Sequence, residues 1–572
     1  MNFLNILLIV RNFLSHNWKS LIIIFVPIVL LPLAVTGNKA MQCGYIIGIV
    51  AVFWITEVMN LAVTSLIPIV LFPAFGILTP STVAACYMKD ITLMLIGGLI
   101  VAKTVEKQNL HKRLAIRILK LMGPNPIFQY LGFMLSTWFL SMWISNTATT
   151  AMMITLADAV VQQWQLMAQS DHEEKLTRNG RRLSESNEFE MTNMKNVYTI
   201  SENEETLNYE LKKIQKFGKG LFLCVAYAAT CGGIATLPGT APNLVFYGFM
   251  EERYKDKMKL NFGSFILFSF PLSVIIVLFC WMLLCVRYVG ISSIFKRKID
   301  PQRDRKAMKL IDDELSSLGS FSFGEISTLL VFIGLVLLWV LREPGIPLLG
   351  KLFTFKNSKG QDVQYWTDSL SAILAALFVF NLPAKNPFKS HNGEKSEKLI
   401  DWKYIERGFS WGLVFLFGGG FALAAGCENS GLSPIIGDVL TNLNTLPHYA
   451  IILILSLGIS FLTEITSNSA TVTILLPIML KMAECIRMHP MKIGLAVTIA
   501  CSFSFCLPAA TPPNAIVFST GKIRVIDMAT SGFLLNIICV IVLSIMVQFY
   551  SVPIFNTNEF PDWIQVNCSK IQ

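Results

Sequence analysis

The sequence has few charged residues. Only 15% of its 572 residues are Asp, Glu, Lys or Arg, whereas 53% are hydrophobic. A soluble globular protein of this length carries a larger charged share on its surface, so the composition excludes that class. The mean hydropathy, +0.56, is strongly positive. We therefore expect an all-α polytopic membrane protein, with the lipid bilayer as its main partner.

The sequence also lacks the motifs of metal and phosphate chemistry. Its twelve cysteines and six histidines show no Cys-x-x-Cys pair, no zinc spacing and no disulfide framework. It has no His-Glu-x-x-His pair, no phosphate-binding loop and no Ser with a His partner at membrane depth, which argues against an intramembrane hydrolase. We expect no enzyme activity and no cofactor. The net charge of +10 arises mainly in loops and predicts contact with anionic lipid, not with nucleic acid.

Three short motifs occur twice, in the same order. The pairs are Gly97-Gly98 with Gly418-Gly419, Ser145–Thr149 with Ser467–Thr471, and Gly239–Asn243 with Ala510–Asn514. The first two pairs lie 321 and 322 residues apart and the third 271, so the first copy carries about 50 extra residues. These correspond to residues 165–216, the most polar part of the chain, which predict a solvated insertion, with disorder as one reading. The chain therefore contains an internal repeat.

Eleven apolar stretches are candidates to cross a hydrocarbon core of roughly 30 Å. They lie near Leu21–Thr36, Tyr45–Asn60, Leu61–Leu78, Ile91–Ala102, Leu221–Met250, Phe262–Val289, Ile326–Leu341, Ser369–Leu382, Ser410–Gly426, Ile493–Gly521 and Gly532–Ser551. Because Lys and Arg accumulate in cytoplasmic loops, we place Lys103–Lys120, 165–216, Arg287–Lys309 and Lys385–Arg407 inside.

Equivalent loops of the two copies then face opposite sides. The segment Glu428–His448, which corresponds to the basic segment Lys103–Lys120, contains no Lys or Arg. This is typical of an inverted-topology repeat, in which the substrate binds near the bilayer midplane between the halves. A cytoplasmic N-terminus and eleven crossings leave the C-terminus outside, where Asn567 begins the only Asn-x-Ser/Thr glycosylation sequon. We predict a transporter that is glycosylated at Asn567.

Two further apolar segments fit these side assignments only as re-entrant hairpins. They span 127–160 and 450–485, and they place Asn146 and Asn468 near their tips. Prolines such as Pro238 and Pro512 predict broken spans with free carbonyls. Hydroxyls, amides and helix N-termini can hold an anion without Lys or Arg, while carbonyls and hydroxyls can hold a small cation. An oxyanion accompanied by cations is therefore the expected ligand. The protein that binds it is expected to be a carrier, with a channel as the alternative.

Other polar and small residues have open interpretations. The glycine pairs near 97 and 418 are expected to be helix-packing positions and not ligand contacts. Glu57, Asp158 and Glu464 are intramembrane carboxylates, for which function is the default hypothesis. A structural acceptor role for Glu57 is an equal alternative. Glu464 lies four residues before Asn468 and has two equal interpretations. It shapes the second cation site, or it has no part in that site.

Several motifs together resemble one family. They are Trp54–Val58, the paired Ser-Asn motifs, Gly232–Leu237, Leu507–Val517 and Phe560–Trp563. In these motifs the chain resembles the divalent anion:sodium symporters, which include animal sodium-coupled dicarboxylate, citrate and sulfate carriers and the insect I'm-not-dead-yet carrier. The likeness covers essentially the whole chain except the insertion. It implies a plasma-membrane homodimer with a fixed scaffold and a mobile transport domain that moves the site like an elevator.

The resemblance also implies site residues. The substrate would contact Ser145, Asn146, Thr147, Thr240, Ala241, Ser467, Asn468, Ser469, Thr511 and Pro512. One sodium ion would lie near Ser141, Ser145, Asn146 and Gly239, and a second near Thr463, Thr466, Asn468 and Ala510. The third position of the second motif is commonly Thr in dicarboxylate, Val in citrate and Pro in sulfate carriers of the family. Because Ser469 is closest to Thr, we expect four-carbon dicarboxylates such as succinate, then citrate, then sulfate.

One further departure from the family and a division into segments complete these expectations. Pro238 stands where relatives often carry Thr, which leaves a sodium-independent carboxylate exchanger as an alternative. The expected segments are scaffold helices in 1–90 and 251–409, transport elements in 91–250 and 410–525, and a last helix with an extracellular tail in 526–572.

Overall fold

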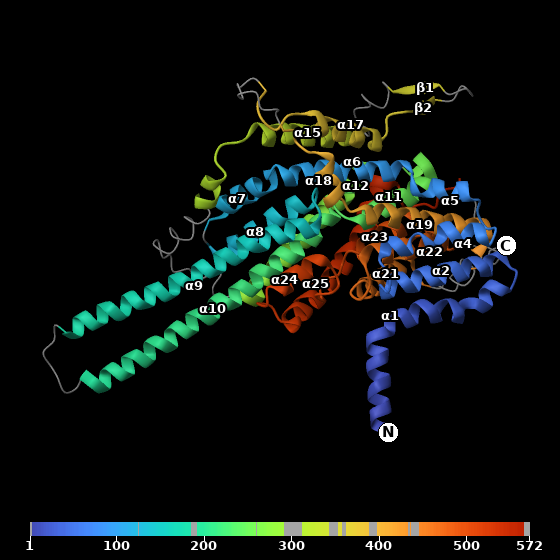
Figure 1. The fold of residues 1–572 in the computed structure, drawn as a ribbon. Coiled ribbons are helices and arrows are strands. Elements are labelled where there is room, and N and C mark those ends of the chain that lie inside the picture. The colour runs from blue at the N-terminus through green and yellow to red at the C-terminus, as the bar shows by residue number, and fades with distance from the viewer. Residues whose placement is uncertain are drawn as a thin grey trace.

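The computed structural model of the chain is built almost wholly from helices (Figure 1). It describes residues 3–123, 125–184, 192–258, 260–290, 312–341, 353–356, 362–387, 397–432, 435 and 446–564. Within them, the only strands are two short ones, β1 (Thr354–Lys356) and β2 (Asp362–Gln364), which pair antiparallel. The predicted all-α polytopic fold is confirmed. Asn567 and most of the segments Arg287–Lys309 and Glu428–His448 lie outside the described residues.

The helices of the first half alternate between long spans and short broken pieces. They are α1 (Phe3–Val35), α2 (Lys39–Thr56), α3 (Leu61–Thr64), α4 (Ile67–Ala74), α5 (Pro80–Tyr87), α6 (Asp90–Lys107), α7 (Leu110–Met122), α8 (Pro126–Ser141), α9 (Asn146–Ser184), α10 (Thr192–Ile234), α11 (Ala241–Tyr254), the 3-10 turn η1 (Lys255–Met258) and α12 (Phe262–Leu284) with the π-helical turn η2 (Cys285–Val289).

The second half has the same character. Its helices are α15 (Phe323–Val340), α17 (Asp368–Asn381), α18 (Trp402–Gly408), α19 (Trp411–Ser430), α21 (His448–Leu462), α22 (Asn468–Cys485), α23 (Pro490–Ala500), α24 (Pro512–Ser519), α25 (Val525–Ile545), the π-helical turn η4 (Met546–Tyr550) and α26 (Ser551–Phe555).

The expected spans correspond to these helices. Among the described residues, eight helices are long and apolar enough to cross a membrane, and they coincide with eight of the eleven expected spans. The other three fall on shorter apolar helices, namely α3 with α4, α17, and α23 with α24. The protein is therefore a multi-pass membrane protein, but three of its expected spans are short or interrupted.

The two predicted hairpins are pairs of helices joined by a few residues. Helix α8 ends at Ser141 and α9 begins at Asn146, while α21 ends at Leu462 and α22 begins at Asn468. The first arms have 16 and 15 residues, about 24 and 22 Å at 1.5 Å per residue. A hydrocarbon core of roughly 30 Å is thicker than either arm. The lengths suit arms that turn back within the membrane.

The described part of the polar insertion is helical. Helix α9 continues to Ser184 and α10 starts at Thr192, and the two extend side by side away from the body of the molecule (Figure 1). The reading of disorder is therefore wrong for residues 165–184 and 192–216. Polar composition does not prevent this, because Glu, Lys and Gln are good helix formers.

Helix α10 forms the centre of the bundle. Within Leu207–Ile234 of α10, 94% of the most apolar window is buried, whereas all but one of the residues in Asn17–Val35 of α1 are exposed or half-buried. Helix α10 contacts α8, α9, α12 and α24. The indole of Trp138 in α8 donates to Ser273 Oγ of α12 at 2.6 Å, and that hydroxyl donates to the Cys231 carbonyl of α10 at 2.5 Å. The first hairpin is thus fixed to the most buried helix.

Cysteine chemistry differs from the expectation at one position. Cys485, at the end of α22, is disulfide-bonded, a single bond that the absence of a disulfide framework in the sequence did not predict. The ten other cysteines in the described part of the chain are free, and nine of them are buried. These behave as small apolar side chains, as expected.

The repeated glycines lie where helices approach closely. A Cβ atom at Gly97 would lie 2.5 Å from the carbonyl carbon of Ala372 in α17. A Cβ at Gly418 would lie 2.1 Å from the Tyr87 ring, and one at Gly419 would lie 2.9 Å from Ser65. Neither pair lines the main cavity. Their prediction as packing positions is confirmed for these three.

Adjacent glycines provide a matched test of this packing. Gly97→Ala forces apart α6 and α17, so we expect it to lower the free energy of unfolding by about 1–3 kcal/mol. Gly98→Ala meets its nearest atom only at 3.8 Å, so helix propensity makes it neutral or up to about 1 kcal/mol stabilising. Thermal unfolding of both purified variants in detergent measures the difference. Equal destabilisation by the two variants would contradict the packing assignment.

Candidate functional site

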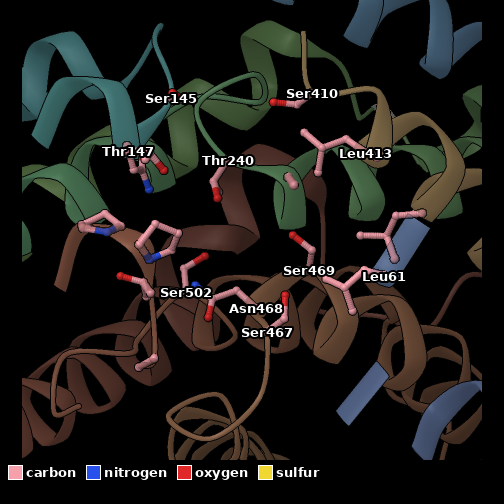
Figure 2. Close-up of a pocket in the computed structure, with 18 of the residues that line it drawn as sticks. Leu61, Ser145, Thr147, Thr240, Ser410, Leu413, Ser467, Asn468, Ser469 and Ser502 are labelled. Atoms are coloured by element: carbon pink, nitrogen blue, oxygen red, sulfur yellow. The ribbon is translucent and has the colours of Figure 1, made fainter. Parts of the chain in front are cut away.

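The two hairpin tips and the two broken spans line one cavity of about 950 Å³. Figure 2 shows Ser145, Thr147 and Thr240 facing Ser467 and Ser469 across it. All ten predicted substrate contacts line this cavity: Ser145, Asn146, Thr147, Thr240, Ala241, Ser467, Asn468, Ser469, Thr511 and Pro512. Segments up to 367 residues apart in sequence are therefore brought together at one place.

Four helices begin at the cavity. Helix α9 starts at Asn146, α11 at Ala241, α22 at Asn468 and α24 at Pro512, and each of these residues lines it. The free amide groups of a helix N-terminus carry positive partial charge. The described lining contains no Lys or Arg, and Glu57 is its only charged residue. Positive potential at this cavity thus comes from backbone amides.

Each hairpin tip holds its asparagine in the same way. Ser141 Oγ lies 2.5 Å from Asn146 Oδ1, and Thr463 Oγ1 lies 2.7 Å from Asn468 Oδ1, five residues apart in both copies. Thr463 Oγ1 also lies 2.8 Å from the Cys501 carbonyl of the broken span. Hydroxyl and amide oxygens therefore gather behind each tip, and a carbonyl oxygen joins them at the second.

The residues predicted to hold sodium fall within these two groups. Gly239, Thr466 and Ala510 line the cavity beside the asparagines, whereas Ser141 and Thr463 are fully buried behind them. Every donor in the predicted sets is an oxygen, which is what a hard cation prefers. The chemistry of both sets fits sodium. Carbonyls freed by the broken helices would complete the coordination, and a bound ion would supply positive charge beside the substrate.

Two further asparagines hold the broken spans open. Asn243 Nδ2 donates to the Thr236 carbonyl at 2.7 Å and the Gly233 carbonyl at 3.1 Å. Asn514 Nδ2 donates to the Leu507 carbonyl at 3.0 Å and the Ser504 carbonyl at 2.9 Å. In both copies the acceptors lie seven and ten residues earlier, so the repeat extends to individual hydrogen bonds. Both asparagines belong to the third repeated motif, but their role as partners of these carbonyls was not predicted from the sequence.

Glu464 stabilises the second broken span and does not line the cavity. Its carboxylate accepts from the Cys506 and Leu507 amides at 2.8 and 3.0 Å and from Asn536 Nδ2 of α25 at 2.7 Å. The equivalent position of the first copy is Met142, whose carbonyl accepts from Thr236 Oγ1 at 2.5 Å. Equivalent segments of the two halves therefore form their hydrogen bonds with different groups, a side-chain carboxylate in one and a backbone carbonyl in the other. Glu464 acts on the second tip by positioning the backbone.

The opposite wall of the cavity was not predicted. It comes from the end of α2, from α3 and from α19, and includes Glu57, Asn60, Leu61, Ser410 and Leu413. Glu57 is exposed and has a left-handed backbone (φ 48°), which is unusual for a residue other than glycine. None of these residues belongs to a doubled motif, although Ser410 and Leu413 precede the repeated glycines of α19, so duplication gave no signal for them. Asp158, by contrast, forms an ion pair with Lys522 away from the cavity.

An all-helical, multi-pass fold with paired hairpins around a polar cavity defines a membrane transporter. Residues 14–556 match the family model described as the sodium:sulfate symporter transmembrane region, and the chain belongs to this family. It is 42% identical to human solute carrier family 13 member 2 over 96% of this chain and 95% of that one. It is 38% identical to the mouse Na(+)/citrate cotransporter over 95% and 96% of the two chains.

Among solved structures, the Alcanivorax borkumensis YdaH transporter superposes with a TM-score of 0.44 at 12% identity, over 81% of this chain and 86% of that one. The family membership shows that the protein is a transporter of sodium-coupled anion carrier type and not an enzyme.

Removing Asn514 tests whether it holds the broken span. Asn514→Ala leaves the Ser504 and Leu507 carbonyls without their amide partner, which costs about 1–3 kcal/mol. Local opening of this segment then becomes about 5- to 160-fold more frequent. Cys506 lies in it and is only 8% exposed, so its labelling by a maleimide reagent reports opening. We expect correspondingly faster labelling, measured by peptide mass spectrometry.

Asn429→Ala serves as the matched control, because Asn429 is exposed and donates only within its own helix, to the Ala425 carbonyl. Unchanged Cys506 labelling in Asn514→Ala, or equal acceleration by Asn429→Ala, would show that the segment does not depend on Asn514.

Proposed function

We propose that the protein is a sodium-coupled secondary transporter of four-carbon dicarboxylates such as succinate, with citrate as the next substrate. The observation that carries this proposal is the convergence of two hairpin tips and four helix N-termini on a cavity without Lys or Arg. Sulfate transport and sodium-independent carboxylate exchange are the alternatives. The family description names sulfate and the mouse relative's name includes citrate, so the family spans both kinds of anion.

The electrostatics suit a divalent anion. Each helix N-terminus is equivalent to about half an elementary charge, so four supply roughly two positive charges. Sodium ions behind the asparagines would add to this charge when bound. A dianion then enters a site where an unpaired charge would otherwise be expensive. Substrate and sodium would share Asn146 and Asn468, and this shared contact is a direct route to coupling.

Ser469 is the main support for a dicarboxylate. Its hydroxyl faces the cavity opposite the first tip (Figure 2). A hydroxyl can donate to a second carboxylate, whereas Val or Pro at this position offers no donor. The cavity volume does not select among succinate, citrate and sulfate, because all are much smaller than it. Side-chain chemistry at Ser469 would therefore set the preference.

We further propose an elevator movement of the hairpins and broken spans against a scaffold. The cavity lies between these elements and the wall formed by α2, α3 and α19, so this proposal assigns α19 to the scaffold and not to the transport elements expected in 410–525. Ion pairs join the two sides near the end of α11: Arg253 with Glu428 of α19 at 2.5 Å, and Glu252 with Lys89. Ion pairs of this kind can break and form again with other partners, as the sliding of one group of helices past another requires. A homodimer, a plasma-membrane location, a cytoplasmic N-terminus and a glycosylated outer tail at Asn567 belong to the same proposal.

Uptake by expressing cells tests the paired site. Radiolabelled succinate, citrate and sulfate are supplied with sodium or choline outside, to wild type, Asn146→Ala and Asn468→Ala. We expect sodium-dependent succinate uptake that falls at least tenfold in both variants, because each loses one hydrogen-bonding amide from a shared contact, about 1.5–3 kcal/mol for a charged partner. Counterflow of preloaded succinate separates a carrier from a channel.

Uptake that persists in choline but is lost in both variants would retain the anion site and refute sodium coupling. Absence of anion uptake by folded protein at the cell surface would refute the transport proposal itself.

Substitution at Ser469 tests the substrate preference. Ser469→Val replaces the hydroxyl donor by a larger, apolar side chain, so we expect the succinate-to-citrate uptake ratio to fall about tenfold. Ser519→Val is the control, because Ser519 is in α24 but outside the cavity and donates only to the Ile516 carbonyl. An unchanged ratio in Ser469→Val would remove Ser469 from the specificity argument.

A further inference from the structure

A second pocket, of about 310 Å³, lies beside the middle of α10 and shares no lining residue with the transport cavity. It is formed by α10, η2 and the start of α25, and its lining includes Lys212, Lys216, Lys219, Arg287, Tyr288 and Asp527. Four cationic side chains and one carboxylate give it a net charge of about +3. No residue of this pocket belongs to the transport cavity.

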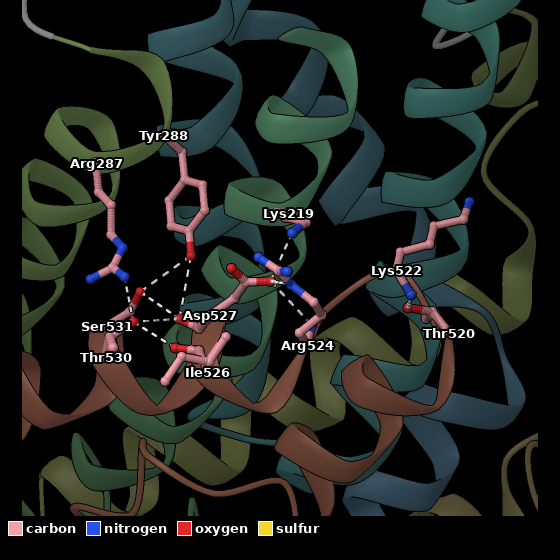
Figure 3. Close-up of polar contacts among 10 residues, drawn as sticks. All are labelled: Lys219, Arg287, Tyr288, Thr520, Lys522, Arg524, Ile526, Asp527, Thr530 and Ser531. Carbon is pink, nitrogen blue, oxygen red and sulfur yellow. Dashed lines mark hydrogen bonds and ion pairs between the residues drawn. The ribbon is translucent and has the colours of Figure 1, made fainter. Parts of the chain in front are cut away.

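The single carboxylate in the pocket is already neutralised. Lys219 Nζ lies 2.7 Å from Asp527 Oδ2, and Arg524 Nε lies 3.3 Å from the same oxygen. Figure 3 shows both cations directed at Asp527. Asp527 also accepts from the Arg524 amide at 3.2 Å and so caps α25. The positive charge of the remaining cations is therefore not cancelled by Asp527.

Lys212 and Lys216 supply that remaining charge. Both are exposed on α10, one helical turn apart, and neither has an ion-pair partner among the described residues. Arg287 is held toward the pocket by its bond to Thr530 Oγ1, and Tyr288 places its hydroxyl beside Ser531 Oγ at 3.3 Å (Figure 3). Two ammonium groups, a guanidinium and a hydroxyl make a phosphate-binding set.

Apolar side chains flank this set. Met282 and Val286, at the end of α12 and in η2, are 45% and 49% exposed, and Ile526, at the start of α25, is 59% exposed. In a membrane protein such exposed apolar side chains contact acyl chains. The pocket thus lies where lipid headgroups meet the protein. Its segments adjoin the basic loops expected to face the cytoplasm, where anionic lipids are concentrated.

We propose that this pocket binds the headgroup of an anionic phospholipid from the cytoplasmic leaflet, with Lys212, Lys216 and Arg287 around the phosphate and the acyl chains against Val286 and Ile526. Free phosphate offers the same oxygen chemistry but would gain nothing from the apolar flank. The inference does not depend on which anion the transport cavity carries. Because α10 runs from this pocket to the broken span at Ile234, a bound lipid would brace the helix that positions the first tip.

Binding by the purified full-length protein in neutral detergent tests the proposal. Native mass spectrometry measures the retention of dioctanoyl phosphatidylserine, dioctanoyl phosphatidylcholine and inorganic phosphate. Each cation near a membrane surface contributes about 1 kcal/mol, so Lys212→Ala with Lys216→Ala is expected to weaken phosphatidylserine binding about thirtyfold. Lys213→Ala with Lys403→Ala removes two exposed lysines outside the pocket and is expected to change it less than about twofold.

Four results would overturn the proposal. They are no preference of the wild type for phosphatidylserine over phosphatidylcholine, equal binding of inorganic phosphate, equal weakening in the control double variant, and unchanged binding in the pocket double variant. Size-exclusion profiles and thermal unfolding of each variant establish that the proteins compared are folded.

Discussion

The whole arrangement depends on how backbone groups freed inside a membrane find partners. A helix that stops in the bilayer leaves amides and carbonyls that lipid cannot satisfy. This chain stops four helices at one cavity and supplies partners from side chains: Asn243 and Asn514 for the carbonyls, and Glu464 for two amides. The remaining amides lie at helix N-termini that line the cavity. A ligand rich in oxygen can accept hydrogen bonds from these amides. The fold and the binding site therefore follow from the same need to pair backbone groups inside the membrane.

The two copies of the repeat form these hydrogen bonds in nearly the same way, with small differences. Ser141 with Asn146 and Thr463 with Asn468 repeat the same side-chain contact, and Asn243 and Asn514 repeat the same pair of carbonyl contacts. Glu464 has no acidic counterpart, since Met142 occupies its place and contributes a backbone carbonyl instead. The second half is thus tied by a buried carboxylate to α25 through Asn536, whereas the first is tied through Ser273 to α12. The two hairpin tips are therefore similar, but each is held by different contacts to its neighbouring helix.

Much of the fold and the inner side of the cavity were predictable, because both leave periodic or repeated signals. Apolar stretches gave the spans, and the doubled Ser-Asn motifs gave both tips. Glu57 and Ser410 were not predictable as cavity residues, because neither belongs to a doubled motif, although Ser410 precedes the helix that carries Gly418 and Gly419. The role of Glu464 depends on amides 42 and 43 residues away, a contact that no local pattern encodes. The helical insertion was missed because polarity was taken as evidence against order, although its residues are good helix formers.

The central claim is that one set of oxygens and amides serves an anion and sodium together. Equilibrium binding of radiolabelled succinate to the purified protein, titrated with sodium at constant ionic strength, tests it most directly. If the ligands share their contacts, sodium must raise succinate affinity and succinate must raise sodium affinity by the same factor. The account predicts succinate binding that is saturable with sodium and absent in choline. Equal succinate affinity in sodium and in choline would contradict it.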